Sequence, residues 1–247
     1  MEETTSQPKL MYKRILLKLS GEALQSDRLF GIDAGKLSRI VNEINSVVQL
    51  GVQVALVIGG GNLVRGSDLC VSGLDRVTAD QMGMLATVIN GLALRDAFDQ
   101  KTIPATLLSA VAMPGIANIY DRFTAEKNLR EGKVVILAAG IGISLVTTDT
   151  AAALRGVEIA ADIIIKATKV DGVFTEDPIK NPKAERYLHL HYNEVIEKRL
   201  GVMDLTAILL CQTHNVPLRV FNMNKAGDLK RIIMGEEIGT FIRGESK

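Results

Sequence analysis

The chain has few of the residues that build disulfides, zinc sites or metal clusters. Cysteine occurs twice among 247 residues, at Cys70 and Cys211, far apart and without the CxxC spacing of redox or zinc motifs. The three histidines, His189, His191 and His214, show no metal-binding spacing with each other or with the cysteines. We therefore expect structural or surface roles for the histidines, no protein-held metal, and a reducing cytoplasmic setting.

Other absences argue against a membrane protein and against a nucleic-acid-binding protein. No apolar run approaches the roughly 20 residues that span a bilayer. Residues 1–11 are polar and lack the apolar segment of a signal peptide, so we expect a disordered tail there. The formal net charge is +1, which gives no general attraction to nucleic acid or to a membrane surface.

The core has to be aliphatic. Tryptophan is absent and aromatic residues make up 4% of the chain, whereas hydrophobic residues make up 47%. Such a composition is typical of parallel sheets rich in Val, Ile and Leu. A chain of 247 residues is long enough for one large α/β domain or two small ones, and we expect a single domain over residues 12–247.

Strand-like and helix-like segments alternate along the chain. Apolar runs predict strands at residues 12–19, 52–58, 106–110, 133–139, 161–167, 218–221 and 240–242. Apolar residues at helical spacing predict helices after residue 33, at 75–98 and 123–131, after residues 147–149, and at 193–200, 203–212 and 228–234. This alternation predicts an α/β fold with a doubly wound, mainly parallel sheet that binds ligands at the carboxyl ends of its strands.

Two of these helices carry apolar residues that we expect to face the core. They are Leu85, Val88, Ile89 and Leu92 in the first, and Leu205, Ile208 and Leu209 in the second. Asp33 is typical of a helix N-cap, and Gly51 of a helix stop.

The segment from Val52 to Gly66 is the strongest functional signal. Its apolar run ends in Gly59, Gly60 and Gly61, where the backbone N–H groups are open to an anion, and Arg65 adds a planar cation. The dinucleotide pattern GxGxxG, the Walker pattern GxxxxGK[ST] and the elbow GxSxG are all absent. We therefore predict a phosphate site that is not built on a P-loop.

A second glycine-rich turn follows the strand at residues 133–139. It includes Gly140 and Gly142 and leads to Thr147, Thr148 and Asp149, of which one can cap the next helix, and we expect at least one of Thr148 and Asp149 to do so. Two such turns at one sheet edge suit a ligand with two phosphate-bearing halves.

Four further side chains can face the same edge. Lys18 and Lys166 lie at strand ends, Asp80 lies near the start of a helix, and Phe174 lies on a loop. Asp80 is either a partner of the helix dipole or an acceptor for sugar hydroxyl groups. Phe174 either stacks on a base or anchors its loop. Lysines, an arginine and two glycine turns favour chemistry on phosphoryl groups.

Several motifs occur together and in order: residues 18–22, 59–62 with 65–66, 147–149, 166–168 with 169–174, 177–178 and 221–223. In this combination the chain resembles the bacterial UMP kinase branch of the amino acid kinase family over almost all of residues 12–242. The resemblance implies a three-layer α/β/α sandwich with an acceptor-binding N-terminal part and an ATP-binding C-terminal part. It also implies transfer of a phosphoryl group from ATP to UMP, a hexamer arranged as a trimer of dimers, and GTP and UTP as candidate effectors.

The resemblance also implies roles for individual residues. Catalytic roles would fall to Lys18, Arg65 and Asp149, with Asp149 orienting the active-site lysine. The residues at ATP would be Lys18, Leu19, Ser20, Gly21, Gly61, Arg65, Thr168, Phe174 and Asp177. The residues at UMP would be Gly60, Asp80, Ile141, Gly142, Ile143, Thr147 and Thr148. No cluster of carboxylates offers a cage, so we expect Mg²⁺ to be held mainly by the ATP phosphates.

The chain departs from this family in its second glycine turn. Many relatives have Gly-Thr-Gly-Asn where this chain has Gly140, Ile141, Gly142 and Ile143. The backbone N–H groups remain, but a hydroxyl and an amide are lost, which leaves substrate stringency open. Basic and aromatic positions linked to GTP in relatives match only partly, so GTP activation is also open.

Three alternatives stay open at this stage. Other members of the family phosphorylate carbamate, acetylglutamate or aspartate, which lack a base and a ribose. A regulator could bind nucleotides without turnover, although Lys18, Arg65 and Asp149 argue against it. A second role on DNA finds no support in the near-neutral charge.

Overall fold

The structure is a computed structural model that describes residues 10–26, 30–65, 71 and 73–244. The predictions for Gly66, Cys70 and most of the N-terminal tail lie outside the described residues. Leu10 and Met11 do not continue a free tail. Leu10 packs against the core, and the backbone N–H of Met11 donates a hydrogen bond of 3.0 Å to the carbonyl of Ile233.

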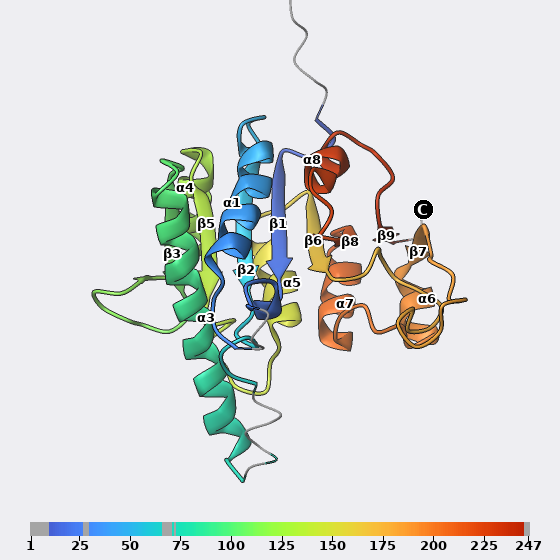
Figure 1. Ribbon diagram of the computed structural model, residues 1–247, viewed down its shortest axis with the longest axis horizontal. Coiled ribbons are helices and arrows are strands. Elements are labelled where there is room, and N and C mark those ends of the chain that lie inside the picture. Colours follow the sequence, from blue (N-terminus) through green and yellow to red (C-terminus); the bar gives the residue numbers. More distant parts are fainter. Residues whose placement is uncertain (1–9, 27–29, 66–70, 72, 245–247) are drawn as a thin grey trace, which may run out of the picture.

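The described strands form one nine-stranded sheet (Figure 1). Their bounds are β1 Arg14–Leu19, β2 Gln53–Ile58, β3 Ala105–Ser109, β4 Asn118–Ile119, β5 Val134–Ala138, β6 Ile163–Thr168, β7 His189–His191, β8 Leu218–Asn222 and β9 Thr240–Arg243. The order is β4-β3-β5-β2-β1-β6-β8-β9-β7, and every pair is parallel except β8 with β9. β1 therefore lies in the middle of the sheet, so ligand-binding turns from both halves converge on its carboxyl end.

Helices cover both faces of this sheet. Their bounds are α1 Ala34–Val48, α3 Arg76–Asp99, α4 Arg122–Arg130, α5 Thr148–Glu158, α6 Tyr192–Glu197, α7 Leu205–Thr213 and α8 Asp228–Ile233, with a short 3₁₀ helix η1 at Gly21–Ala23. One hydrophobic cluster joins α1, α3 and α8 to one face, and a second joins α4, α5, α6 and α7 to the other. The three-layer α/β/α sandwich is confirmed.

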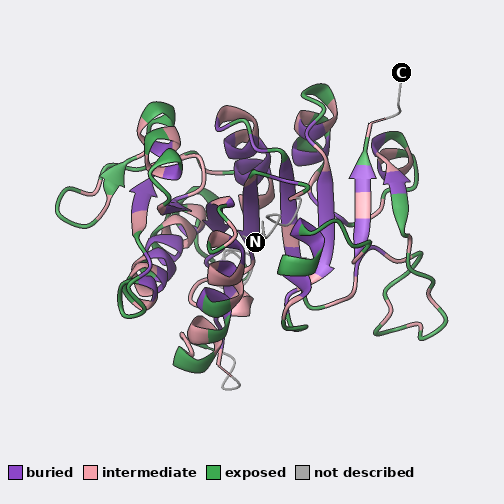
Figure 2. Cartoon of the chain, turned by 90° about the horizontal axis from the view of Figure 1, so that it is seen from above, coloured by how far each residue is buried: buried purple, intermediate pink, exposed green. Residues whose placement is uncertain are grey.

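The central strands are buried on both sides, as their apolar runs predict (Figure 2). In β1, Ile15 and Leu17 belong to one cluster and Leu16 to the other. Capping also follows the sequence, because the Asp33 carboxylate accepts from Lys36 N at 2.8 Å and begins α1. Gly51 takes the left-handed conformation, with a φ of 85°, just after that helix.

Two short strands were not predicted. β4 lies in a segment interrupted by Pro114 and Gly115, and β7 has only the residues His-Leu-His, so neither shows an apolar run. The helix expected at residues 203–212 begins at Leu205, because Asp204 is its N-cap and accepts from Ala207 N at 2.9 Å.

Four of the expected core positions were wrong. Leu85 and Ile89 on α3 are 52% and 51% exposed, and Leu205 and Leu209 on α7 are 57% and 44% exposed. Each helix has apolar residues on more than one side, and only the sheet decides which side is covered. Val88 and Ile208 are buried as expected, and Leu92 packs at the edge of the core. In the described part of the chain, no helix combines the length and the apolar character that crossing a membrane requires.

Candidate active site

The centre of the site is a carboxylate between two lysines. Lys18 and Lys166 are register partners on the parallel strands β1 and β6. Lys18 Nζ lies 2.8 Å from Oδ1 of Asp149, and Lys166 Nζ lies 2.8 Å from its Oδ2. All three side chains are at most 16% exposed. These groups meet at the carboxyl end of the central strands, where the sequence places the ligand.

Burial and two neighbouring charges shift the pKa of Lys166. Burial lowers its pKa below the ordinary value of 10.5, Asp149 raises it, and the charge of Lys18 lowers it again. Lys166 Nζ also donates a hydrogen bond to the carbonyl oxygen of Val202. The sequence marked Lys166 only as a lysine at a strand end; the structure makes it the second partner of Asp149.

Asp149 is held at the amino end of α5. Thr147 is the N-cap of this helix, and its hydroxyl oxygen accepts from Asp149 N at 3.0 Å. Thr148 and Asp149 are therefore helical residues, and the capping that was expected of at least one of them is carried out by Thr147. The Asp149 carboxylate is free of capping and faces the lysines.

Asp204 fixes this end of α5, and the sequence analysis missed it. Its carboxylate accepts from Thr150 Oγ1 at 2.8 Å and from the hydroxyl of Thr147. Burial raises the pKa of Asp204, but the hydrogen bonds from Thr147, from Ala207 N and from Thr150 outweigh it and lower the pKa below 3.8. The available signal was an Asp just before a helical pattern, which is a common cap.

Gly21 and Gly60 are packed so closely against their neighbours that a side chain at either would have no room. A Cβ on Gly21 would lie 2.5 Å from Asn62 Oδ1 and 2.7 Å from Gly61 N. A Cβ on Gly60 would lie 2.7 Å from the carbonyl oxygen of Gly83 on α3, whereas Gly61 faces open space. The glycines thus bring the turn after β1 against the turn after β2 and leave the backbone at Gly61 accessible.

Ser20 and Leu19 contribute to this turn in different ways. Ser20 caps η1, and its side chain accepts from Glu22 N at 3.3 Å. Leu19 is fully buried, so only its backbone can reach a ligand.

Arg65 lies at the exposed rim of the first turn. Its guanidinium is paired with Glu22 at 2.7 Å, and its Nε donates to the carbonyl oxygen of Gly61 at 3.3 Å. Glu22 also pairs with Lys169 at 3.0 Å. Both cations are therefore near the turn but engaged with Glu22 rather than aimed into free space.

The second glycine turn has unusual backbone angles. Ala139 and Gly140 have φ values of 59° and 57°, and Gly142 has a φ of 80°, where a Cβ would lie 3.1 Å from the carbonyl oxygen of Ala110. Ile143 is 63% exposed. Asp80 on α3 accepts from Leu145 N at 2.8 Å and pairs with Arg76 at 3.0 Å. Asp80 thus ties the turn to α3 in addition to any role towards a ligand.

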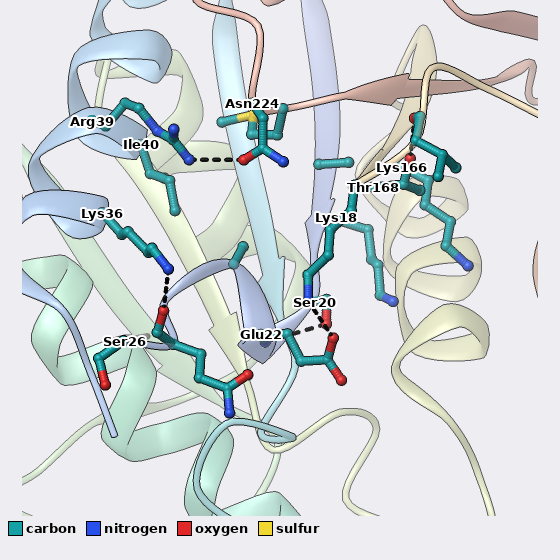
Figure 3. A pocket seen from close by; sticks show the side chains of 16 residues that line it. Lys18, Ser20, Glu22, Ser26, Lys36, Arg39, Ile40, Lys166, Thr168 and Asn224 are labelled. Atoms are coloured by element: carbon teal, nitrogen blue, oxygen red, sulfur yellow. Dashed lines mark hydrogen bonds and ion pairs between the residues drawn. The ribbon is translucent and has the colours of Figure 1, made fainter. Parts of the chain in front are cut away.

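Three cavities lie along this edge of the sheet. A small one of about 140 Å³ is lined by Gly60, Asp80, Ile141, Ile143 and Thr148, among others. A second of about 700 Å³ lies between β1, β6 and α1. Figure 3 shows Lys18, Ser20, Lys36 and Arg39 around it, with Arg39 hydrogen-bonded to Asn224. A third of about 470 Å³ is lined by Lys166, Thr168, Phe174, Asp177 and residues 198–202.

The third cavity collects the remaining predicted residues. The Thr168 hydroxyl donates to the carbonyl oxygen of Val170 at 2.7 Å, and the exposed Asp177 accepts from Ile179 N at 3.0 Å. Phe174 is half-buried and forms a short bridge with Arg186. Val173 and Gly201 add apolar wall, which suits a planar base.

The cavities of about 700 and 470 Å³ share Lys166 and Thr168, whereas the cavity of about 140 Å³ lies at the second glycine turn. Apart from Asp149, which lies between the two lysines, the other predicted residues lie at the turns and line none of these three cavities: Leu19, Gly21, Gly61, Arg65, Gly142 and Thr147. Among the described residues, no three His, Cys, Asp or Glu side chains gather as metal ligands do. Both oxygens of Asp149 contact lysines, so a metal ion at the phosphates would find its ligands on those phosphates and on water.

Comparison with known proteins assigns the chain to a family. The model of the "Amino acid kinase family" matches residues 13–222. The uridylate kinase of Ectopseudomonas mendocina (strain ymp) is 55% identical over 247 residues, which is 100% of both chains. The uridylate kinase of Aeromonas salmonicida (strain A449) is 57% identical over 238 residues, 96% of this chain and 98% of that protein.

A solved structure has the same architecture. The crystal structure of UMP kinase from Bacillus anthracis superposes with a TM-score of 0.92 at 40% identity and covers 95% of this chain and 97% of that one. The arrangement of strands and turns described above is therefore shared with proteins that carry that name.

Proposed function

Since the chain belongs to the amino acid kinase family, we propose that it transfers the γ-phosphoryl group of ATP to UMP and releases ADP and UDP. The observation that supports this most directly is the buried group of Lys18, Asp149 and Lys166 between two glycine turns. The three groups together carry one net positive charge, which attracts a phosphoryl group. The product would enter pyrimidine nucleotide biosynthesis.

The two nucleotides would approach from opposite ends of the site. Part of UMP would occupy the 140 Å³ cavity, which Gly60, Asp80, Ile141, Ile143 and Thr148 line, and the rest would extend along the turn towards Gly142 and Thr147. The base of ATP would occupy the 470 Å³ cavity beside Phe174, with Thr168 and Asp177 at its edge. The chain then has an acceptor-binding N-terminal part and an ATP-binding C-terminal part within one domain over residues 12–247.

Positioning and charge neutralisation would carry the catalysis. A UMP phosphate oxygen is already nucleophilic, so in-line transfer needs no strong base and no covalent intermediate. Lys18 would contact the transferred group, and Asp149 would hold Lys18 in place. The backbone N–H groups of residues 19–21 and 61 would bind donor phosphates, and Arg65 would exchange Glu22 for phosphate oxygens.

Mg²⁺ would enter with ATP and neutralise charge on its phosphates. The described residues fit that arrangement better than a protein cage, because Asp149 and Glu22 already hold cations. Their part is to bind and orient the nucleotides.

We also propose a cytoplasmic homo-oligomer, a hexamer built as a trimer of dimers. Its support in the molecule is the uncovered apolar side of α3 at Leu85 and Ile89. GTP and UTP are the effectors to test. Rates measured with and without each nucleotide decide this point, and unchanged rate curves would count against regulation.

A coupled ADP-release assay tests the function. UMP should give the highest kcat/KM in a panel that includes CMP, AMP, aspartate, acetylglutamate and carbamate. ADP release that responds to a carboxylate acceptor but not to UMP would assign another activity of the same family. Calorimetric binding of UMP without any ADP release would identify a nucleotide-binding regulator instead.

A further inference from the structure

We propose that Asn90 and Thr87 of α3 are positioning residues that set the two glycine turns relative to each other. The inference rests on the proposed phosphoryl transfer and assigns roles that act through the two turns, although Thr87 also lines the cavity proposed for UMP. The two side chains are three residues apart on the inner side of one helix, and both are at most 2% exposed. Each one hydrogen-bonds a different turn.

Asn90 holds the first turn through a closed pair of amides. Its Nδ2 donates to the carbonyl oxygen of Gly59 at 2.8 Å and to Asn62 Oδ1 at 2.7 Å. Asn62 Nδ2 returns a hydrogen bond of 3.0 Å to Asn90 Oδ1 and donates another, also of 3.0 Å, to the carbonyl oxygen of Gly31. All four amide hydrogens of the pair are used, so the network specifies one arrangement of the turn.

The same pair reaches the turn after β1. Asn62 Oδ1 lies so close to Gly21 that a Cβ there would come within 2.5 Å of it. Gly59 N also donates to the carbonyl oxygen of Leu19 at 2.9 Å. The backbone that would bind donor phosphates therefore packs against Asn62, and hydrogen bonds with Asn90 fix the position of Asn62.

Thr87 holds the second turn at a residue in the left-handed backbone conformation, Ala139. Its hydroxyl accepts from Ala139 N at 2.7 Å and donates to the carbonyl oxygen of Met84, also at 2.7 Å. Ala139 has a φ of 59°, a conformation that costs free energy for a residue with a side chain. The hydroxyl of Thr87 fixes the N–H at this position, so it fixes the direction of the Gly140–Gly142 turn.

α3 is therefore one rigid body that carries both turns. Gly60 packs on Gly83 and Ala86, and a Cβ on Gly91 would lie 2.6 Å from Leu107, so the helix lies tightly against turn and sheet. In-line transfer requires the two phosphates to meet within a fraction of an ångström of the reactive geometry. α3 supplies that constraint through the hydrogen bonds of Asn90 and Thr87 to the two turns, while Asp80 and Thr87 of the same helix also line the cavity of about 140 Å³.

The test compares variants in the full-length protein. Thr87→Val has nearly the same volume and lacks the hydroxyl, whereas Thr87→Ser keeps it. We expect Thr87→Val to raise KM for UMP about 10-fold and to leave KM for ATP within about twofold, and we expect Thr87→Ser to behave as wild type. Asn90→Leu should lower kcat by about 10-fold or more, because both substrates meet at the first turn.

Two controls separate positioning from stability alone. Val88→Ala opens a cavity in the same helix and should lower the melting temperature while both KM values and kcat per folded molecule stay at wild-type levels. In the double variant Asn62→Leu with Asn90→Leu, apolar packing should restore part of the stability that Asn90→Leu loses, while turnover stays low. If kcat and KM of the Thr87 and Asn90 variants match those of Val88→Ala, the inference is wrong.

Failure of this inference can be distinguished from failure of the proposed function. If the wild-type protein releases no ADP with UMP, the proposed function fails. Calorimetric titration of UMP into wild type, Thr87→Val and Thr87→Ser then tests the inference. Weaker binding to Thr87→Val alone supports it, and equal or undetectable binding to all three overturns it.

Discussion

Lys18 and Lys166 are register partners on adjacent parallel strands, and their ammonium groups contact opposite oxygens of one carboxylate. Two buried cations side by side repel each other, and Asp149 compensates only one of the two charges. The remaining positive charge is stabilised when a phosphoryl group arrives. This positive charge therefore stabilises the complex with bound nucleotide phosphates and the transition state relative to the empty site. Electrostatic catalysis operates through such stabilisation of the transition state.

Replacing Lys18 tests this arrangement. In Lys18→Ala, Asp149 still has Lys166 as a partner at 2.8 Å, so the fold and the assembly should persist. The transferring group loses its cation, and turnover should fall on the order of 10²-fold or more. Steady-state ADP release, with circular dichroism and gel filtration as checks, measures both parts. Near-wild-type turnover in a soluble, assembled variant would refute the role assigned to Lys18.

The lowered pKa of Lys166 predicts a pH effect on stability. Between its folded pKa and 10.5, the unfolded chain binds more protons at this residue than the folded chain does. The free energy of unfolding therefore gains a contribution that rises with pH through this window and levels off above 10.5. Relative to Lys166→Met, wild type should gain stability as the pH rises, and urea unfolding at a series of alkaline pH values shows it.

Lys198 provides the matched control for that experiment. It is the exposed C-cap residue of α6, and its pKa is raised, mainly by a hydrogen bond with Glu194. Its contribution to stability is lost as the pH rises through its folded pKa, so comparison with Lys198→Met should give the opposite slope. Equal slopes for the two lysines would contradict the assignment of Lys166 as a buried cation.

Asp204 makes a contribution to stability that is lost in acid, whereas the contribution of Lys198 is lost in alkali. It caps α7 and accepts from the two threonines of α5, so Asp204→Ala should lower the free energy of unfolding by about 2 kcal/mol near neutral pH. Because its folded pKa lies below 3.8, this contribution is present above 3.8 and is lost as the pH falls through the folded value. Urea titrations of wild type and variant should differ by a constant amount above pH 3.8 and converge below it.

Much of the fold follows from local pattern. Apolar runs marked the strands that are buried on both faces, and Asp33 and Gly51 marked the ends of α1, because these signals depend only on neighbouring residues. β4 and β7 were missed since pairing, not hydrophobicity, holds strands of two and three residues. Leu85 and Ile89 were placed in the core because a helix with apolar residues on several sides does not reveal which side the sheet covers.

The candidate site could likewise be predicted from the sequence only in part. Glycine turns, the strand-end lysines and Asp149 could be recognised because their chemistry shows in short motifs. Asn90, Thr87 and Asp204 act through hydrogen bonds to residues 28 to 57 positions away, and no local pattern records such distances. The pairing of Arg65 with Glu22 is equally invisible in the sequence, although it decides where the guanidinium lies before a nucleotide binds.

The exposed side of α3 predicts an assembly. A charge at Ile89, which is 51% exposed, cannot be buried against a second copy without a large cost, so Ile89→Lys should shift the protein to smaller species in analytical ultracentrifugation. Lys101→Glu is a control on the exposed loop after α3, and its sedimentation should match wild type. An unchanged oligomer in Ile89→Lys would show that this surface is not an interface.

The last prediction concerns acceptor selectivity at the second glycine turn. Ile141 and Ile143 line the 140 Å³ cavity, and their side chains offer neither a donor nor an acceptor to the polar edge of a pyrimidine. A site that hydrogen-bonds a base rejects analogues far better than an apolar wall does, because mismatched polar groups are left unpaired. We therefore expect a modest ratio of kcat/KM for UMP over CMP, and we expect Ile143→Asn to raise it by about 10-fold. The ratio is measured in one reaction with both acceptors present, so errors in enzyme concentration cancel. Leu145→Asn adds an amide to the same turn at another exposed position and should leave the ratio unchanged. If both variants change it equally, general polarity of the loop and not residue 143 sets the selectivity.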